Sequence, residues 1–336
     1  MRKFVSVFLI IAMTFATVAV ATACGGNDSG KENDVTVVIS TSTGDKSFND
    51  SAKGGVDRLV EDGYKAAFVE CGSNQELFEQ NLKAAAESSA MVVAVGSEFT
   101  FIGDVAKEYP DVKFAWVDNA VEEPEAYENL VNISYAQNEG SYLVGYIAAK
   151  ESKSGTVGFV GGMDIPVIND FLAGFKQGAE DAGAKVVNNY TNDETWSDVN
   201  IGKQCAQDLA SKGADVIFGC CGGCGIGVID NAKDGGYMCI GVDADQRQSK
   251  PESADVIYCS MVKEVGNSIY DLVKKFIDDE EFAGGTIWKA GLEGGYVGVA
   301  YGAEDQEQLV SDEIKAAVEE FQGKVASGEL KINTAL

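Results

Sequence analysis

The sequence predicts an α/β protein of two lobes, each built on a doubly wound parallel sheet. Short apolar runs alternate with amphipathic segments of helical period along most of the chain, which is the pattern of strands connected by helices. The alternation comes in two series that separate near residues 151–155, where we expect a hinge crossing. The 336 residues, 45% of them hydrophobic, are enough for two cores.

The first series begins with an expected strand at 35–40 and a helix at 50–62. In that helix, Ala52, Val56 and Leu59 recur on one side, so the helix has one apolar face for packing against a sheet. The same alternation then continues, with strands at 66–70, 91–95, 112–117 and 131–135 and helices at 75–88, 99–109 and 140–150.

The second series repeats this arrangement from residue 156 onward. Its apolar runs are again short enough for strands and are separated by segments of helical period. The expected strands lie at 156–160, 185–190, 215–219, 238–242, 255–260 and 296–300, and the expected helices at 169–181, 197–211, 227–233, 262–278 and 305–327.

The N-terminus indicates export. Arg2 and Lys3 precede an apolar run over 4–23 that ends in small residues, and Cys24 follows directly. This pattern is typical of a bacterial lipoprotein signal peptide over 1–23, with Cys24 receiving the lipid and residues 24–33 serving as a flexible tether. The alternative is an uncleaved membrane anchor, because the run is as long as a spanning helix. Both interpretations place the folded part outside the cytoplasmic membrane and attached to it.

Composition excludes several functions. The chain has 26 Lys and Arg against 53 Asp and Glu, a net charge of −27, so nucleic-acid polymers are poor partners. It has no histidine, which removes Ser-His-Asp and Cys-His catalysis and His-ligated metals. We therefore predict a binding protein, with no catalytic residue, cofactor or metal.

Polar and aromatic residues gather where the expected strands end. Open parallel sheets bind ligands beyond the carboxyl ends of their strands, so these positions are candidates for a binding site. Their acids, amides, aromatic rings and single lysine are what a cleft for a small polar molecule with a flat part requires. The candidates are Asp45, Phe48, Asn49, Ser97, Asp118, Trp196, Gly222, Asp243 and Lys263.

Each candidate also has a structural interpretation. Phe48 and Trp196 precede helices and are alternatively packing staples. Lys263 is expected in the first turn of the helix over 262–278, where a cation opposes the helix dipole, so a binding role is favoured over a surface lysine. The carboxylates are alternatively turn or helix-capping residues, namely Asp45, Asp118 and Asp243.

The segment 219–227 is rich in glycine and cysteine. It lacks the Gly-Lys-Ser/Thr of a phosphate-binding loop and the spacing of a dinucleotide-binding loop, which leaves close backbone approach to a neutral ligand or tight packing. Cys220, Cys221 and Cys224 could bind a soft metal or form a disulfide, for example with Cys205. They are alternatively small buried apolar residues.

Five segments, two of them specific motifs, carry a family resemblance. The two motifs are residues 44–49 (GDKSFN) and 241–246 (GVDADQ), and the other segments are 138–145, 158–163 and 260–263. In these segments, which match in the same order along the chain, the sequence resembles the basic membrane protein family of ABC-transporter substrate-binding lipoproteins. This family includes the purine nucleoside receptor PnrA. The resemblance covers nearly the whole chain after the signal peptide.

The resemblance implies a type I periplasmic-binding-protein fold with two lobes and three crossings. The expected lobes are 34–151 with about 262–285, and 152–261 with about 286–336. It also implies a monomeric, lipid-anchored protein on the outer face of the bacterial cell membrane. By this resemblance, such a protein captures a purine nucleoside and delivers it to an ABC permease.

The resemblance assigns roles to the candidates. Phe48 and Trp196 would stack on the two faces of the base, and Asp45 and Asn49 would hydrogen-bond to it. The ribose would be held by Asp243, with Asp118 and Lys263 completing that end. The segment 219–227 departs from the family pattern, so the resemblance does not fix the ligand contacts there. The alternatives are a receptor of the same fold for a sugar or signalling molecule, and a nucleoside-cleaving enzyme.

Overall fold

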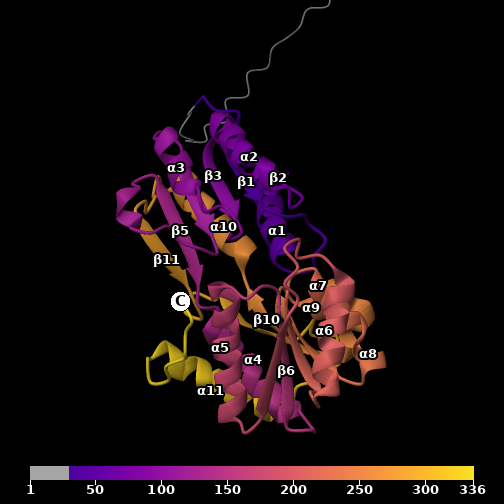
Figure 1. Cartoon of the computed structure of the whole chain (residues 1–336). Coiled ribbons are helices and arrows are strands. Elements are labelled where there is room, and N and C mark those ends of the chain that lie inside the picture. Colours follow the sequence, from indigo (N-terminus) through magenta and orange to yellow (C-terminus); the bar gives the residue numbers. More distant parts are fainter. Residues whose placement is uncertain (1–29) are drawn as a thin grey trace, which may run out of the picture.

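The computed structural model describes residues 30–336, which fold into two lobes, one above the other in Figure 1. The predicted signal peptide over 1–23 and the lipid site at Cys24 lie outside the described residues. Each lobe holds a six-stranded sheet within this part of the chain. The α/β fold with two parallel-dominated sheets is as predicted.

The first lobe is built on the strand order β11-β5-β4-β3-β1-β2, with every pairing parallel. Its central strand β3 is almost entirely buried because both faces of the sheet are covered by helices. The elements of this lobe are β1 (Asn33–Ile39), α1 (Phe48–Glu61), β2 (Ala66–Glu70), α2 (Gln75–Ser88), β3 (Ser89–Val95), α3 (Ile102–Glu108), β4 (Lys113–Val117), β5 (Leu130–Tyr135), α10 (Val265–Asp278) and β11 (Thr286–Ala290), with a short 3-10 turn at Pro124–Ala126.

The second lobe repeats this topology in the order β12-β10-β9-β8-β6-β7, with an antiparallel edge strand β12. Its helices are α4 (Gln137–Glu151), α5 (Pro166–Asp181), α6 (Val199–Ser211), α7 (Cys224–Asp230), α8 (Ala232–Gly235), α9 (Gln246–Ser249) and α11 (Asp312–Ala326), with a 3-10 turn at Pro251–Val256. Its strands are β6 (Thr156–Gly161), β7 (Lys185–Tyr190), β8 (Val216–Cys220), β9 (Met238–Asp243), β10 (Ile257–Lys263) and β12 (Val297–Ala300).

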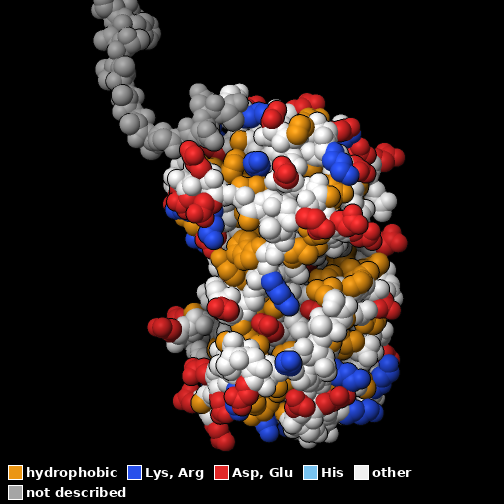
Figure 2. All heavy atoms as spheres, turned by 90° about the vertical axis from the view of Figure 1, so that its left-hand side faces the viewer, with side chains coloured by type: hydrophobic (Ala, Val, Ile, Leu, Met, Phe, Trp, Pro, Cys, Tyr) orange, Lys and Arg blue, Asp and Glu red, His pale blue; other side chains and the backbone are white. Residues whose placement is uncertain are grey.

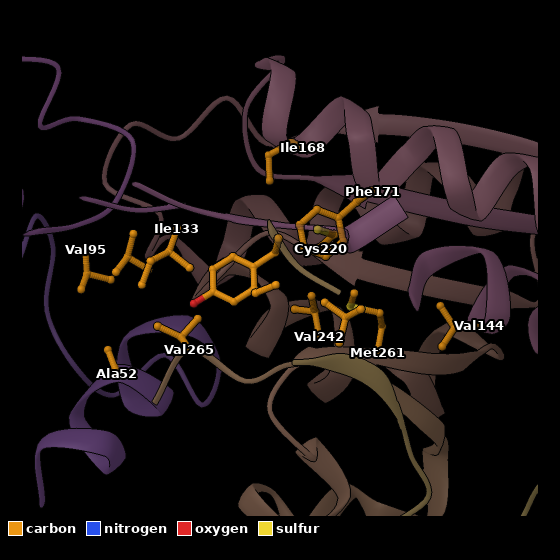
Figure 3. Close-up of a cluster of buried hydrophobic side chains, with 14 of the residues drawn as sticks. Ala52, Val95, Ile133, Val144, Ile168, Phe171, Cys220, Val242, Met261 and Val265 are labelled. Carbon is orange, nitrogen blue, oxygen red and sulfur yellow. The ribbon is translucent and has the colours of Figure 1, made fainter. Parts of the chain in front are cut away.

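A continuous apolar cluster runs through both lobes. Figure 3 shows Val95 and Ile133 of the first lobe in the same cluster as Phe171, Val242 and Met261 of the second. Two further clusters lie under the outer helices, one in each lobe. The lobes therefore meet through packed side chains as well as through the chain crossings.

Three segments connect the lobes. The chain passes from β5 to α4 at Ala136, returns from β10 to α10 at Glu264, and passes again from β11 to β12 over 291–296. Three crossings of this kind limit the lobes to a hinge motion in which each sheet moves as a unit.

The positions of two crossings differ from the prediction. Helix α4 packs against α5, α11 and β12, so the first lobe ends at residue 136 instead of 151. Small residues on α4 and α5 decide this, because they let the two backbones approach closely. Strand β11 pairs with β5, so 286–290 belongs to the first lobe and not to the second. Its side chains are mostly exposed, which hides the strand from a search for apolar runs.

Several smaller predictions need correction. Strand β10 continues to Lys263, which pairs with Val297, so Lys263 ends a strand and does not begin a helix. The last helix begins at Asp312 instead of residue 305. The last residues of the expected tether over 24–33 belong to the folded part, because Lys31 donates to the carbonyls of the helix over 75–88 and β1 begins at Asn33.

The surface of the described part is strongly acidic, and Figure 2 shows Asp and Glu side chains spread over both lobes on either side of a waist. None of the helices described here has the length and apolar character needed to span a membrane.

The α4–α5 packing gives a stability prediction. A Cβ atom at Gly174 would lie 1.9 Å from the carbonyl oxygen of Asn138, so Gly174→Ala must push the two helices apart. We expect Gly174→Ala to lower the free energy of unfolding by about 1–3 kcal/mol in chemical denaturation. Gly323→Ala, on α11 with no atom within 4 Å, is the matched control and should raise it by about 0.5–1 kcal/mol. Equal denaturation midpoints for the two variants would contradict this packing.

Candidate functional site

A cavity lies between the lobes where the carboxyl ends of the two sheets face each other. It contains about 640 Å³ of space free of protein atoms, part of it open to solvent. All nine predicted site residues line it: Asp45, Phe48, Asn49, Ser97, Asp118, Trp196, Gly222, Asp243 and Lys263.

The topology explains why these residues meet. In the first sheet the strand order reverses between β1 and β3, and in the second between β6 and β8. A crevice opens beyond the carboxyl ends of the strands at such a reversal, and ligands of open α/β sheets bind there. The loops after β1, β3 and β8 supply Asp45, Ser97 and Gly222 to the cavity.

Aromatic rings reach the cavity from both lobes. Phe48 opens α1 in the first lobe, and Trp196 lies in the loop between β7 and α6 in the second. Both are half-buried, as rings that face a cavity are. The indole of Trp196 lies against Gly162, where a Cβ atom would be 2.0 Å from a ring carbon. Glycine at 162 therefore makes room for this ring.

The loop that holds Trp196 is organised by Asp193. Its carboxylate accepts hydrogen bonds from the backbone N–H groups of Thr195, Ser197 and Asp198 at 2.8–3.0 Å. Partial burial raises the pKa of Asp193, but these donors outweigh burial and bring the pKa down to about 2. An ionised Asp193 thus fixes the turn in which Trp196 adopts a left-handed φ of 56°.

Asp45 caps the first helix as well as lining the cavity. Its carboxylate accepts from the backbone N–H groups of Ser47, Asn49 and Asp50 at 2.9–3.1 Å. Burial raises its pKa, against the effect of these donors. The helix-capping interpretation of Asp45 is thus realised. Beside it, the amide of Asn49 donates to Oγ1 of Thr41, another lining residue, at 2.8 Å, and its Oδ1 is an acceptor.

Lys263 is the ammonium group of the cavity, and it comes from the second lobe. Its Nζ lies 2.6 Å from Asp118 Oδ1 of the first lobe, and its side chain is only 2% exposed. Three aromatic rings surround it, with ring centroids 5.0–5.1 Å from Nζ, at Phe48, Tyr135 and Phe171. Since an ion pair this buried is stable only when both partners are present, the pair joins the lobes.

Asp243 ends β9 next to this ion pair. Its Oδ2 accepts a hydrogen bond from Ser47 Oγ at 2.5 Å. Burial raises the pKa of Asp243 from 3.8 to about 6, although Lys263 and Ser47 act in the opposite direction. Burial also raises the pKa of Asp118 against the pull of Lys263. These carboxylates are therefore costly to ionise in the closed protein and gain from any further hydrogen-bond donor.

The cavity as a whole is negative. Four carboxylates line it against the single ammonium group of Lys263, namely those of Asp45, Glu98, Asp118 and Asp243. Such a site favours neutral ligands rich in donors and disfavours phosphate groups.

Cysteine makes the cavity wall at the end of β8 apolar. Cys220 and Gly222 line the cavity after β8, and the seven cysteines of the described part are buried free thiols. Burial raises the pKa of the Cys220 and Cys221 thiols well above its ordinary value, so both are neutral. Within residues 30–336, no group of three or more Cys, Asp or Glu is placed to hold a metal ion.

The sequence reasoning missed several lining residues. They come from the end of β1, the loop after β3, the start of α5 and the end of β8. The residues at the start of α5 could have been suspected from the sequence, because the loop that leads to them follows the end of strand β6, and the other candidates also follow strand ends. The missed residues are Ser40, Thr41, Gly96, Glu98, Ile165, Val167, Ile168, Phe171 and Cys220.

Comparison with known proteins identifies the family. The model of the Bmp family, PnrA-like substrate-binding proteins of ABC transporters, matches residues 32–335. The chain belongs to this family. Two similar proteins are basic membrane protein A of Borreliella burgdorferi, 30% identical over 98% of this chain and 95% of its own length, and the CD4+ T-cell-stimulating antigen of Listeria monocytogenes, 32% identical over 96% and 97%.

Solved structures agree with this assignment of the chain to the Bmp family. A solute-binding protein of an ABC transporter system from Aeropyrum pernix superposes with a TM-score of 0.77 and 27% identity, over 89% of this chain and 93% of that one. A second such protein, from Conexibacter woesei, has a TM-score of 0.72 at 22% identity, over 90% and 99%, and supports the fold.

The buried carboxylate of Asp243 gives a pH prediction. Because its pKa is raised in the folded state, the folded protein binds this proton more tightly than the unfolded chain does. The ionised group therefore destabilises the fold above pH 6, and this penalty disappears as the pH falls from about 6 to 4. We expect Asp243→Asn to raise the free energy of unfolding of the ligand-free protein by about 2 kcal/mol at pH 8 and by almost nothing at pH 4. The same difference at both pH values would contradict the raised pKa.

Proposed function

We propose that this protein is the extracytoplasmic substrate-binding lipoprotein of an ABC importer and captures a nucleoside, in the first place a purine nucleoside, between its lobes. The observation that carries the proposal is the arrangement of one cavity with aromatic rings from both lobes and a cluster of buried carboxylates around a single ammonium group. A nucleoside has the matching parts, a flat apolar base and a ribose rich in hydroxyl donors.

The base binds between rings of opposite lobes. Phe48 and Trp196 both line the cavity, one from each lobe, so a flat molecule between them contacts both lobes at once. Stacking of a base on an aromatic side chain contributes about 1–3 kcal/mol per contact. Asn49 Oδ1 is the nearby acceptor for an amino or ring N–H group of the base.

The ribose binds at the carboxylates. Asp243 and Asp118 are buried acceptors, and each has its pKa raised by burial. Ribose hydroxyl groups that donate to them form charge-assisted hydrogen bonds and offset part of the desolvation penalty. Lys263 holds Asp118 in place and supplies a donor for a ribose oxygen. The excess of carboxylates disfavours nucleotides.

Ligand binding then favours the closed form of the two lobes, which is the state that the permease recognises. After removal of the predicted signal peptide, the lipid on Cys24 holds the protein, as a monomer, to the outer face of the cell membrane. In this role the protein binds and releases its ligand unchanged.

Isothermal titration calorimetry tests the ligand. We expect adenosine, guanosine or inosine to bind with a Kd in the micromolar range or tighter, uridine to bind more weakly because its base offers less stacking area, and ribose alone to give no measurable heat. Binding of ribose with silence for every nucleoside would replace this proposal with a sugar receptor of the same fold. Release of free base during incubation would indicate a nucleoside-cleaving enzyme.

Asp243 tests the ribose contact. We expect Asp243→Asn to weaken binding of the preferred ribonucleoside by about 3 kcal/mol, more than a hundredfold in Kd, because two charge-assisted bonds lose their charge. Binding of the free base measured in parallel should change by less than about threefold, since the base makes no contact with this side chain. Equal losses for nucleoside and base would remove the ribose role from Asp243.

A further inference from the structure

The two motifs that carry the family resemblance are bonded to each other across the lobe boundary. The segment 44–49 precedes and opens α1 in the first lobe, and 241–246 ends β9 and opens α9 in the second. Four residues of these two motifs line the cavity, namely Asp45, Phe48, Asn49 and Asp243. Lys46, Ser47 and Gln246 do not line it, so ligand contact gives no reason for these three residues to meet.

Gln246 makes the first of these contacts. Its side chain is buried, with the residue only 1% exposed. Its Oε1 accepts from the backbone N–H of Val242 at 3.1 Å, within the second lobe. Its Nε2 donates to the carbonyl oxygen of Lys46 at 3.1 Å, in the first lobe. Because the oxygen end of the amide is held within its own lobe, the nitrogen end is fixed toward the other.

Ser47 makes the second contact. It is fully buried, and its hydroxyl donates to Asp243 Oδ2 at 2.5 Å. Its own backbone N–H is held by Asp45 Oδ1 at 3.0 Å, so the hydroxyl is carried by a fixed turn. Ser249 Oγ, 3.5 Å from the Lys46 carbonyl, adds a longer contact on the same acceptor. The turn also carries strain, since Lys46 has a φ of 56°.

We infer that Gln246 and Ser47 form a latch that holds the lobes closed without touching the ligand. Each joins a donor on one lobe to an acceptor on the other, and both bonds break when the lobes separate. Gln246 is thus a positioning residue for ligand retention. The bound ligand stabilises the closed form through contacts inside the cavity. The latch slows reopening of the lobes through hydrogen bonds that lie beside the cavity. The inference rests on the proposed nucleoside ligand only for the choice of probe.

Gln246→Glu tests the latch at pH 8, where the introduced carboxylate cannot donate a hydrogen bond. The substitution keeps the oxygen that binds the Val242 N–H and removes the donor to Lys46. We expect the Kd for the preferred purine nucleoside to rise about tenfold. The rise should come mainly from faster dissociation in stopped-flow measurements. The Tm of the ligand-free protein does not report on the latch, because a carboxylate at this buried position also lowers stability through its desolvation.

The matched control is Gln207→Glu. Gln207 is exposed on α6 of the same lobe, and its Nε2 donates to Asn231 Oδ1 within that lobe, so the variant adds the same charge without touching the boundary. It should bind the nucleoside as the wild type does. An unchanged Kd in Gln246→Glu overturns the latch. A rise in Kd without faster dissociation also overturns it, because the latch acts by slowing the reopening of the lobes.

A ligand-independent measurement separates failure of the latch from failure of the proposed function. Spin labels on cysteines introduced at the exposed residues Glu61 and Lys212 report the distance between the lobes. The closed population of the ligand-free protein should be smaller in Gln246→Glu than in the wild type. If no nucleoside binds the wild type, the proposed ligand is wrong, and the distance distributions alone decide on the latch. Identical distributions overturn it.

Discussion

The structure depends on an ion pair that neither lobe can complete alone. Lys263 ends a strand of the second lobe and is almost fully buried, and its carboxylate partner Asp118 follows a strand of the first. A buried ammonium group without a partner costs several kcal/mol, so closure of the lobes and neutralisation of this charge are the same event. The three aromatic rings around Lys263 keep water away and strengthen the dependence.

Other residues of the site lower the stability of the closed protein. Burial raises the pKa values of Asp45, Asp118 and Asp243, so each resists ionisation in the closed form. Four residues at the lobe boundary also have left-handed backbone conformations, namely Lys46, Asp118, Trp196 and Asp243. Strained loops and desolvated acids are held in place by rigid sheets on both sides. A ligand with well-placed donors relieves the desolvation and thereby favours the closed form.

Much of the site followed from the sequence because one rule governs it. Side chains after the strands of an open parallel sheet share an edge, so eight of the nine candidates required only the strand positions, and Trp196 was selected for its place before a helix. The roles were harder to assign. Asp45 caps a helix by accepting three backbone hydrogen bonds. Lys263 was wrongly predicted to begin a helix, because the strand that contains it is extended by antiparallel pairing of β10 with the distant strand β12. Phe171 was missed because it lies within helix α5, ten residues after the end of β6.

Local patterns along the chain were enough to predict the alternating α/β order, the acidic surface and half of the residues that face the cavity. These follow from local periodicity, composition and position after a strand, which need no long-range contact. The tertiary structure decided which lobe takes α4 and β11, because close packing of glycines and edge pairing act between distant segments. It also decided that the two motifs meet across the boundary, since hydrogen bonds between residues 200 positions apart leave no local trace in the chain.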